Sequence, residues 1–195
     1  MDYTKTRELD AYLKRVLNPH RYIHSLGVVE MADELATIHG ANVQKARFAG
    51  LVHDIAKCYS CETMNRLIRI YGVDLKFFNT PELAHSKVGA AILQKDFGIE
   101  DAEILMSVSS HTAGRYGMSL LEEIIYVADA IEINRTYAEA PELRELAKQD
   151  LDKACLEIIK YSIELLGKSG VPVDNDTYEA KRFFLDKITE RKSKL

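Results

Sequence analysis

The chain has 195 residues, of which 47% are hydrophobic and 29% are charged, a balance typical of one globular domain with a sizeable core. Its formal net charge of −4 argues against a nucleic-acid-binding surface, which would show a basic bias. No apolar run approaches the roughly 18 residues of a membrane helix, and three cysteines do not form a disulfide framework in a chain of this length. We therefore expect a cytoplasmic protein with no nucleic-acid or membrane partner, and we leave a homodimer open.

Helical patterns follow one another along nearly the whole chain, separated by prolines, glycines and capping residues. The first predicted helix ends at 18–19 and the second spans 19–39. A third begins at 42, and a last one begins at 176. Between these two, helices are predicted over 60–72, 81–97, 101–111, 119–133 and 151–166. The acidic stretch 139–145 is expected to be looser, and 168–175 a loop. Since no long alternation of apolar and polar residues predicts a strand, we expect an all-α single domain over 1–195. Its metal core would span about 18–135, with the C-terminal helices of 150–195 packed on it.

An adjacent histidine and aspartate, His53 and Asp54, lie in an otherwise apolar run that we expect to be helical. Neighbours on a helix point about 100° apart, so both side chains reach one metal only if it lies close to that turn. Other helices must complete such a site, and His24 and Asp129 have the required apolar neighbours. Two imidazoles and two carboxylates suit iron, manganese, cobalt or zinc, and they differ from the closed, cysteine-rich set of a structural zinc site.

Each of these residues alone has an ordinary structural explanation, because a single histidine on an apolar helix is more often a hydrogen-bonded core residue. The ordered set is the stronger signal, and it also includes His85 and His111. This series resembles the HD-domain superfamily of metal-dependent phosphohydrolases, whose metal core is a histidine, a His-Asp pair and a distant aspartate. Within that superfamily, the sequence resembles the YqeK family, which hydrolyses diadenosine tetraphosphate symmetrically.

Several segments carry the resemblance in the same order as in the family: Arg21–Val28, His53–Lys57, His85–Ala90, His111–Gly114, Tyr126–Glu132 and Arg135. The chain departs from the family pattern after the last aspartate, where Ala130 and Ile133 replace a bulkier or basic residue and a proline. It departs again near the C-terminus, where Asp174-Asn175 and Lys181 replace a His-Pro pair and an arginine. The metal core itself is intact.

The resemblance implies that His24, His53, Asp54 and Asp129 bind a divalent or trivalent transition metal, in the first place iron. The metal would activate water for in-line attack between the second and third phosphates, which releases two ADP. Asp54, His85 and His111 are the expected catalytic residues. The two histidines either hold a second ion or donate hydrogen bonds to phosphate and protonate the leaving oxygen, and the sequence leaves both roles open.

A wider group of residues is expected to contact the nucleotide. Lys57 lies one helical turn after His53 and Arg21 one turn before His24, so both cations suit phosphate, although a surface salt bridge or a solvated helix end would also explain them. Arg135 reaches the site only if its helix ends near position 133. The full predicted set is Arg21, Lys57, Ser60, His85, His111, Thr112, Asp129, Arg135, Pro172, Asn175 and Thr177.

Two alternatives belong beside this hypothesis. An HD phosphohydrolase acting on another nucleotide would share the metal core, and a substrate panel would separate the two. A non-catalytic nucleotide-binding module is favoured only if a metal ligand is missing, and all four are present. The C-x-x-C spacing of Cys58 and Cys61 lacks both a second pair for zinc and a preceding strand, so we do not assign it a redox role.

Overall fold

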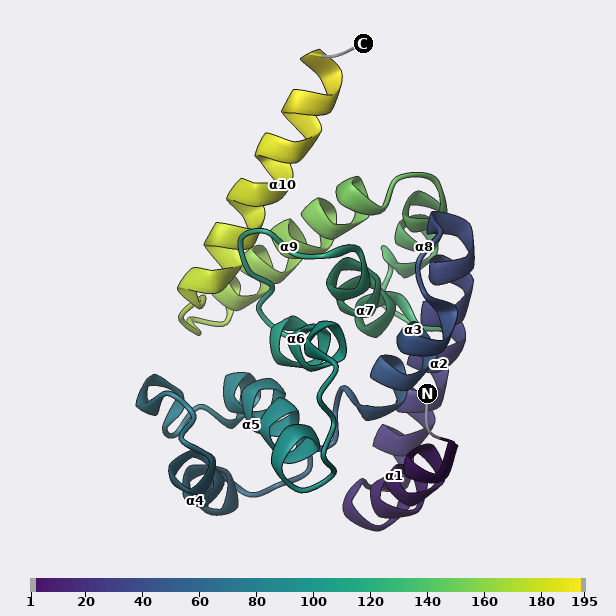
Figure 1. Ribbon diagram of the computed structural model, residues 1–195. Helices are drawn as coiled ribbons and strands as arrows, with labels where there is room; N and C mark the ends of the chain where they lie inside the picture. Colours follow the sequence, from purple (N-terminus) through teal and green to yellow (C-terminus); the bar gives the residue numbers. More distant parts are fainter. Residues whose placement is uncertain (1–2, 194–195) are drawn as a thin grey trace.

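The computed structural model describes residues 3–193, and these form helices without a strand, which confirms the all-α prediction (Figure 1). Most predicted helices are present with ends shifted by a few residues. The elements are α1 Tyr3–Val16, α2 Pro19–His39, α3 Val43–Val52, α4 Cys61–Tyr71, the 3-10 turn η1 Leu75–Phe77, α5 Pro81–Lys95, α6 Ala102–Ser110, α7 Leu120–Ile131, α8 Ala140–Gln149, α9 Leu151–Lys168 and α10 Asn175–Ser193.

Capping residues fix the ends of the helices that carry the functional side chains. The Asn18 side chain accepts a hydrogen bond from the Arg21 backbone N–H at the start of α2, and Gly40 ends that helix with a φ of 74°. Helix α7 begins with a capping box, in which Ser119 and Glu122 bond to each other's backbone N–H groups. Local residues therefore mark where these helices begin and end.

Two predictions about secondary structure were wrong. His53 and Asp54 do not lie within a helix, because α3 ends at Val52 and the next residues form tight turns, with bonds such as Lys57 N–H to the Asp54 carbonyl at 2.9 Å. The buried apolar residues continue through Ala56, so their pattern could not reveal this change of backbone. The stretch expected to be loose is helix α8, which is held by a buried face that includes Leu143 and Ala147.

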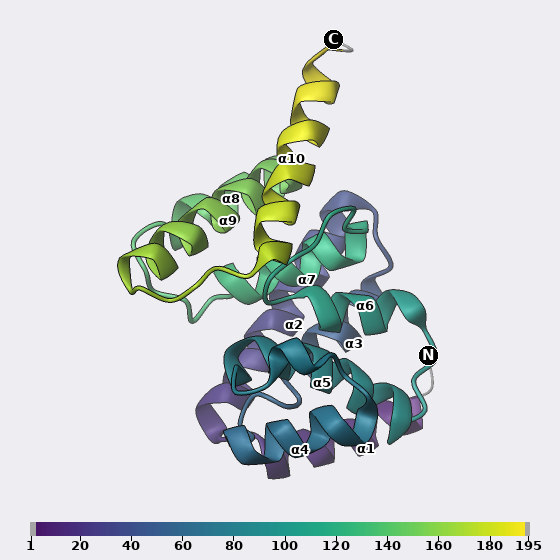
Figure 2. The ribbon, with the colours of Figure 1, turned by 90° about the vertical axis from the view of Figure 1, so that its left-hand side faces the viewer.

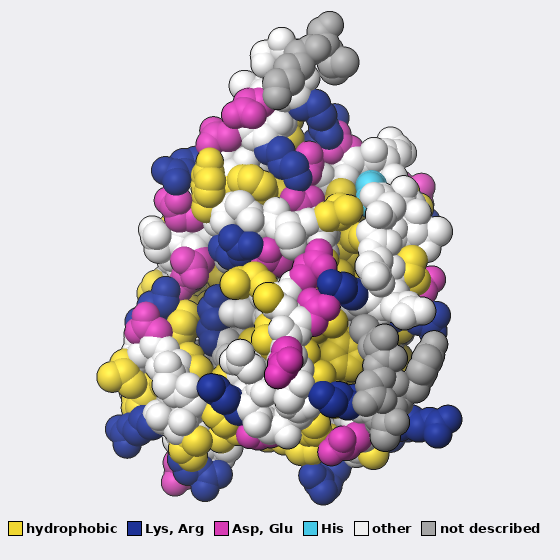
Figure 3. All heavy atoms as spheres, viewed as in Figure 1, with side chains coloured by type: hydrophobic (Ala, Val, Ile, Leu, Met, Phe, Trp, Pro, Cys, Tyr) yellow, Lys and Arg dark blue, Asp and Glu magenta, His cyan; other side chains and the backbone are white. Residues whose placement is uncertain are grey.

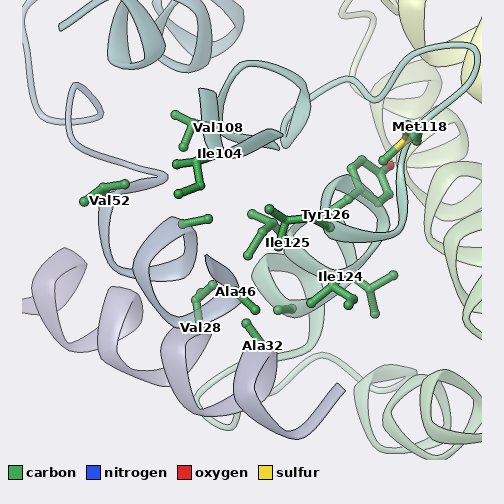
Figure 4. Packing of buried hydrophobic residues seen from close by; sticks show 14 of the residues in the cluster. Val28, Ala32, Ala46, Val52, Ile104, Val108, Met118, Ile124, Ile125 and Tyr126 are labelled. Carbon is green, nitrogen blue, oxygen red and sulfur yellow. The ribbon is translucent and has the colours of Figure 1, made fainter. Parts of the chain in front are cut away.

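Helix α7 lies at the centre of the packing, and nearly every side chain from Leu121 to Ala128 is buried. Figure 4 shows the side chains of Val28 in α2, Ala46 in α3, Val108 in α6 and Ile125 in α7 gathered in one region of the core. Buried hydrophobic residues from α1 to α10 belong to one continuous cluster. The core thus brings together the helices that hold the candidate metal ligands.

The remaining helices lie on either side of this centre. Helices α4 and α5 lie on one side, while α8, α9 and α10 lie on the other, and the end of α10 extends beyond the body (Figures 1 and 2). On the face in Figure 3, Lys and Arg side chains are interspersed with Asp and Glu. Within residues 3–193, no helix is long and apolar enough to cross a membrane.

Candidate metal centre

Five separate segments bring six polar side chains together. His24 comes from α2, the His53-Asp54 pair from the turn after α3, His85 from α5, His111 from the end of α6, and Asp129 from α7. All four histidines and Asp54 are buried, whereas the side chain of Asp129 keeps 22% of its exposure. The packing therefore brings these six side chains to one place, and two of them, His111 and Asp129, line a cavity.

The ligand atoms form two groups that share Asp54. On one side, His24 Nε2 lies 3.0 Å from Asp129 Oδ1, and His53 Nε2 lies 3.3 Å from Asp54 Oδ2. On the other side, the second oxygen of Asp54 lies 3.2 Å from His85 Nε2 and 3.6 Å from His111 Nε2. Each carboxylate oxygen of Asp54 thus faces a different pair of imidazoles.

Hydrogen bonds on the outer nitrogens fix the orientation of the imidazoles. The Nδ1–H groups of His53 and His111 donate to the carbonyls of Gly50 and Val108, both at 2.7 Å. His24 Nδ1 donates to Glu132 Oε1 at 3.1 Å. With the protons on Nδ1, the three Nε2 atoms present lone pairs to the centre, which is the arrangement that metal-binding histidines use.

These residues fit a metal ion. His24 Nε2 and His53 Nε2 are buried side-chain nitrogens without a hydrogen-bond partner, although carboxylate oxygens lie nearby, and a buried group of this kind is costly unless something binds it. The sets His24, His53, Asp129 and His53, Asp54, His111 each have their ligand atoms within 4.8 Å of one another. Such spacings suit ligands that lie about 2.1 Å from one shared ion.

The electrostatics of the centre also favour a cation. Burial alone would raise the pKa of Asp129, but the His24 ring, whose Nε2 lies 3.0 Å from Asp129 Oδ1, and the charge of His53 hold it well below its usual range. Burial likewise opposes ionisation of Asp54, and the surrounding imidazoles nevertheless keep its pKa low. Burial lowers the pKa of His85 to about 4, so this ring is neutral at physiological pH. Two ionised carboxylates set together in the protein interior form a site that needs positive charge.

Three predicted substrate contacts, Arg21, Arg135 and Thr112, adjoin the centre through polar contacts with its side chains. Arg21 Nη1 lies 2.9 Å from Asp54 Oδ2, and Arg135 Nη2 lies 2.9 Å from Asp129 Oδ1. The latter contact forms because α7 ends at Ile131, earlier than the predicted limit. Thr112 Oγ1 lies 3.3 Å from Nε2 of both His85 and His111.

Lys57 reaches the same region by a route that differs from the prediction. Its Nζ lies 3.5 Å from His85 Nε2, although the residue lies in a turn and not on the face of a helix. Lys57 therefore reaches the centre beside His85, while the helical explanation for its position was wrong.

Other predicted contacts lie outside the network of side chains bonded to the centre, as far as residues 3–193 show. Ser60 is exposed and caps α4 by accepting the Thr63 backbone N–H. Pro172 is exposed in the loop before α10, Asn175 begins α10, and Thr177 is buried in its first turn. For these residues the structure gives a position but no polar contact with the centre.

Glu132 was not predicted from the sequence as a residue that orients a metal ligand. Glu132 is 2% exposed, accepts the hydrogen bond of His24, and is itself held by the backbone N–H of Asn134 at 2.8 Å. The sequence carried a signal, since Glu132 follows Asp129 by three residues at the end of an apolar helix. The tyrosines near Asp129, which line the cavity described below, were also missed.

Comparisons with known proteins agree with this geometry. The model of the HD domain family matches residues 21–134. The symmetrical bis(5'-nucleosyl)-tetraphosphatase of Bacillus subtilis (strain 168) is 42% identical over 169 residues, which cover 86% of this chain and 91% of that protein. The symmetrical bis(5'-nucleosyl)-tetraphosphatase of Staphylococcus aureus is 35% identical over 175 residues, which cover 88% of this chain and 90% of that protein. A crystal structure of a predicted HD superfamily hydrolase involved in NAD metabolism, from Clostridium acetobutylicum, superposes with a TM-score of 0.90 at 36% identity and covers 96% of this chain and 98% of that chain.

Proposed function

Because this chain belongs to the HD-domain family, and within it to the symmetrical bis(5'-nucleosyl)-tetraphosphatases, we propose that it is a metal-dependent hydrolase that cleaves diadenosine tetraphosphate into two ADP. The observation that carries the proposal is the buried set of imidazoles and carboxylates in which His24 Nε2 and His53 Nε2 have no hydrogen-bond partner. Cationic side chains beside that set suit a polyphosphate substrate.

His24, His53, Asp54 and Asp129 are the proposed metal ligands, and iron is the proposed ion. Nitrogen and carboxylate ligands in this proportion suit iron among the first-row metals. When bound, such an ion polarises a phosphoryl oxygen and lowers the pKa of water. Asp54 would contribute as a catalytic residue by fixing the centre, because each of its oxygens faces two imidazoles.

The phosphate chain would lie between the cations at the rim of the centre. Arg21 and Arg135 each present a partly exposed guanidinium, and each is already directed at the centre by an ion pair with a carboxylate. A guanidinium has five N–H donors, so it can bind phosphate and keep that ion pair. Lys57 Nζ and the Thr112 hydroxyl would bind further phosphate oxygens beside His85.

His85 and His111 have two candidate roles. With their Nε2 atoms 3.1 Å apart, they would contact a phosphate oxygen and transfer a proton to the leaving group. Alternatively, they would bind a second ion with Asp54, whose Oδ1 lies 3.2 Å from His85 Nε2 and 3.6 Å from His111 Nε2. The ratio of metal to protein distinguishes these roles, since a value near two requires the second site.

Pro172, Asn175 and Thr177 stay predicted nucleotide contacts on the basis of the family resemblance. Ser60 stays one because its segment begins beside Lys57. A single domain and a cytoplasmic location also stay predictions from the sequence, which leaves a homodimer open.

Product analysis on the metal-loaded protein tests the proposal. Labelled diadenosine tetraphosphate should give ADP as its only nucleotide product, and Asp54→Ala should lose both metal and turnover while its circular dichroism remains helical. ATP together with AMP, or no reaction at all, would contradict symmetrical cleavage. A panel of deoxynucleotides and cyclic dinucleotides tests the alternative of another nucleotide substrate.

A further inference from the structure

A cavity of about 360 Å³ adjoins the metal centre on the side of α9. Its walls include Thr112 and Asp129 from the centre, and Tyr161 and Leu165 from α9. This volume lies in the range typical of small-molecule sites. A larger hollow of about 590 Å³ beside α1, α2 and α3 is lined by none of the metal-centre residues, so the smaller one is the cavity connected to the chemistry.

Aromatic and apolar side chains form the part of this cavity away from the metal ligands. The rings of Tyr137 and Tyr161 are stacked, with centroids 5.3 Å apart and planes at 20°. Tyr137 is fixed in this position because its hydroxyl donates to the Ala130 carbonyl at 3.0 Å. Leu165 adds an apolar surface that is 51% exposed. Parallel aromatic rings of this kind are suitable platforms for a nucleobase, since every base has a π-face.

Arg135, a cationic residue that lines the cavity, lies close in sequence to Tyr137 of the stacked ring pair. Arg135 binds Asp129 through both its Nη2 and its Nε, so its guanidinium lies at the metal centre, while Tyr137 is two residues further along. A ligand that reaches from the centre into the cavity therefore meets positive charge first and aromatic rings afterwards. A nucleotide has this order of groups, with phosphates at one end and a base at the other.

We propose that this cavity binds one nucleoside of the dinucleotide, with its phosphates at Arg135 and its base against the Tyr137–Tyr161 pair. A substrate cleaved at the middle of its phosphate chain has a nucleoside at each end, so one nucleoside extends from the centre in each of two directions. The predicted contacts at the start of α10 would serve the other end. The identity of the ligand rests on the proposed function, whereas the cavity and its ring pair do not.

Calorimetric titration of the metal-loaded protein with ADP and with inorganic diphosphate tests the proposal. Leu165→Trp places a large side chain in the cavity from an exposed position, and Tyr161→Ala removes half of the ring pair. Each should weaken one ADP-binding event by about tenfold, the scale of a lost base-stacking contact, and leave diphosphate binding unchanged. Leu185→Trp is the matched control, because Leu185 is 44% exposed on α10 and does not line the cavity.

The outcomes separate this proposal from the proposed function. Wild-type ADP binding in both cavity variants overturns the nucleoside site, even if hydrolysis is symmetrical. Equal loss of ADP and diphosphate binding also overturns it, because the substitutions would then act on the metal centre. Selective loss of ADP binding in a protein that does not hydrolyse diadenosine tetraphosphate supports the cavity and rejects only the reaction.

Discussion

At the scale of single residues, the metal centre depends on side chains that do not themselves bind the ion. His24 can present Nε2 to the centre only because Glu132 accepts the proton of Nδ1, and Glu132 is held in turn by the backbone N–H and the side-chain amide of Asn134. Outer hydrogen bonds of this kind set both the tautomer and the orientation of a ligating imidazole.

Substitution of Glu132 should therefore weaken metal binding without removing a ligand. We expect Glu132→Ala to lower metal affinity by about 10- to 100-fold, as is usual for residues that orient metal ligands. Competition with a chromophoric chelator gives the dissociation constant. Glu142→Ala, which removes an exposed glutamate from α8, serves as the control for charge. Equal affinity in the two variants would show that His24 needs no partner on Nδ1.

The ligands themselves could be predicted from the sequence, whereas their surroundings could not. Histidines and aspartates are conspicuous in apolar segments because burying them is costly without a partner. Glu132 stands at the end of a helix, where a solvated carboxylate is equally ordinary, so burial could not be inferred. The Tyr137–Tyr161 pair joins residues from different elements, and no local pattern records such a contact.

At the scale of helices, local signals predicted boundaries well where a cap or a proline was present. Pro19 and Gly40 delimit α2 as expected, since their effects act on the backbone of their own neighbours. The turn after Val52 has no such marker, because its bonds replace helical ones within an unbroken buried run. Helix α8 was missed because its short apolar face gains its stability mainly from packing.

Close packing between α2 and the end of α7 requires a glycine at position 27. A Cβ on Gly27 would lie 2.2 Å from Glu132 Oε2, so this buried carboxylate would have to move away from His24. We expect Gly27→Ala to fold but to bind metal more weakly, with unfolding and metal titrations as the two measurements. A Cβ at Gly167 in α9 would meet no atom within 4 Å. Gly167→Ala should therefore raise the free energy of unfolding by up to about 1 kcal/mol through helix propensity. Unchanged metal affinity in Gly27→Ala would contradict the required close approach.

Packing of α10 on α7 and α9 involves a buried acid. Glu123 Oε1 and Asp152 Oδ1 both lie 2.6 Å from Lys187 Nζ. Burial raises the pKa of Glu123 to about 7. The nearby charge of Asp152 also raises it, whereas Lys187 lowers it. The pKa of Lys187 is also raised, because its two carboxylates outweigh its burial. Glu123 is the more deeply buried acid, so it is the group that takes up a proton.

The folded chain therefore holds a proton on Glu123 that the unfolded chain, with a pKa of 4.5, has released. The contribution of Glu123 to stability is greatest below pH 4.5 and falls by about 2 to 3 kcal/mol as the pH rises to about 7. We expect the wild type to lose stability relative to Glu123→Gln between about pH 5 and pH 8 in urea unfolding. Glu157→Gln on the exposed face of α9 should show no such divergence, and parallel curves for all three proteins would contradict the assignment.

At the scale of the whole molecule, the candidate metal centre connects segments that are far apart in sequence. Its histidines and aspartates come from α2, the turn after α3, α5, the end of α6 and α7, and the unfolded chain holds no such arrangement. An ion that binds only the folded state stabilises all of these segments together, and an ion concentration about 100 times its dissociation constant adds about 2.7 kcal/mol. Asp54 and Asp129 would also lose the cation that offsets their charge when the metal is removed.

Chelation should therefore lower the unfolding temperature of the metal-loaded protein by roughly 5 to 10 °C, since each kcal/mol corresponds to about 2 to 4 °C in a domain of this size. Differential scanning calorimetry before chelation, after chelation and after metal is restored gives the measurement. Asp54→Ala should show the same unfolding temperature under all three conditions, because it lacks the carboxylate that faces all four imidazoles. A wild-type protein that unfolds at one temperature with or without metal would show that these segments are already held together by the hydrophobic core, and the ion would then contribute to chemistry alone.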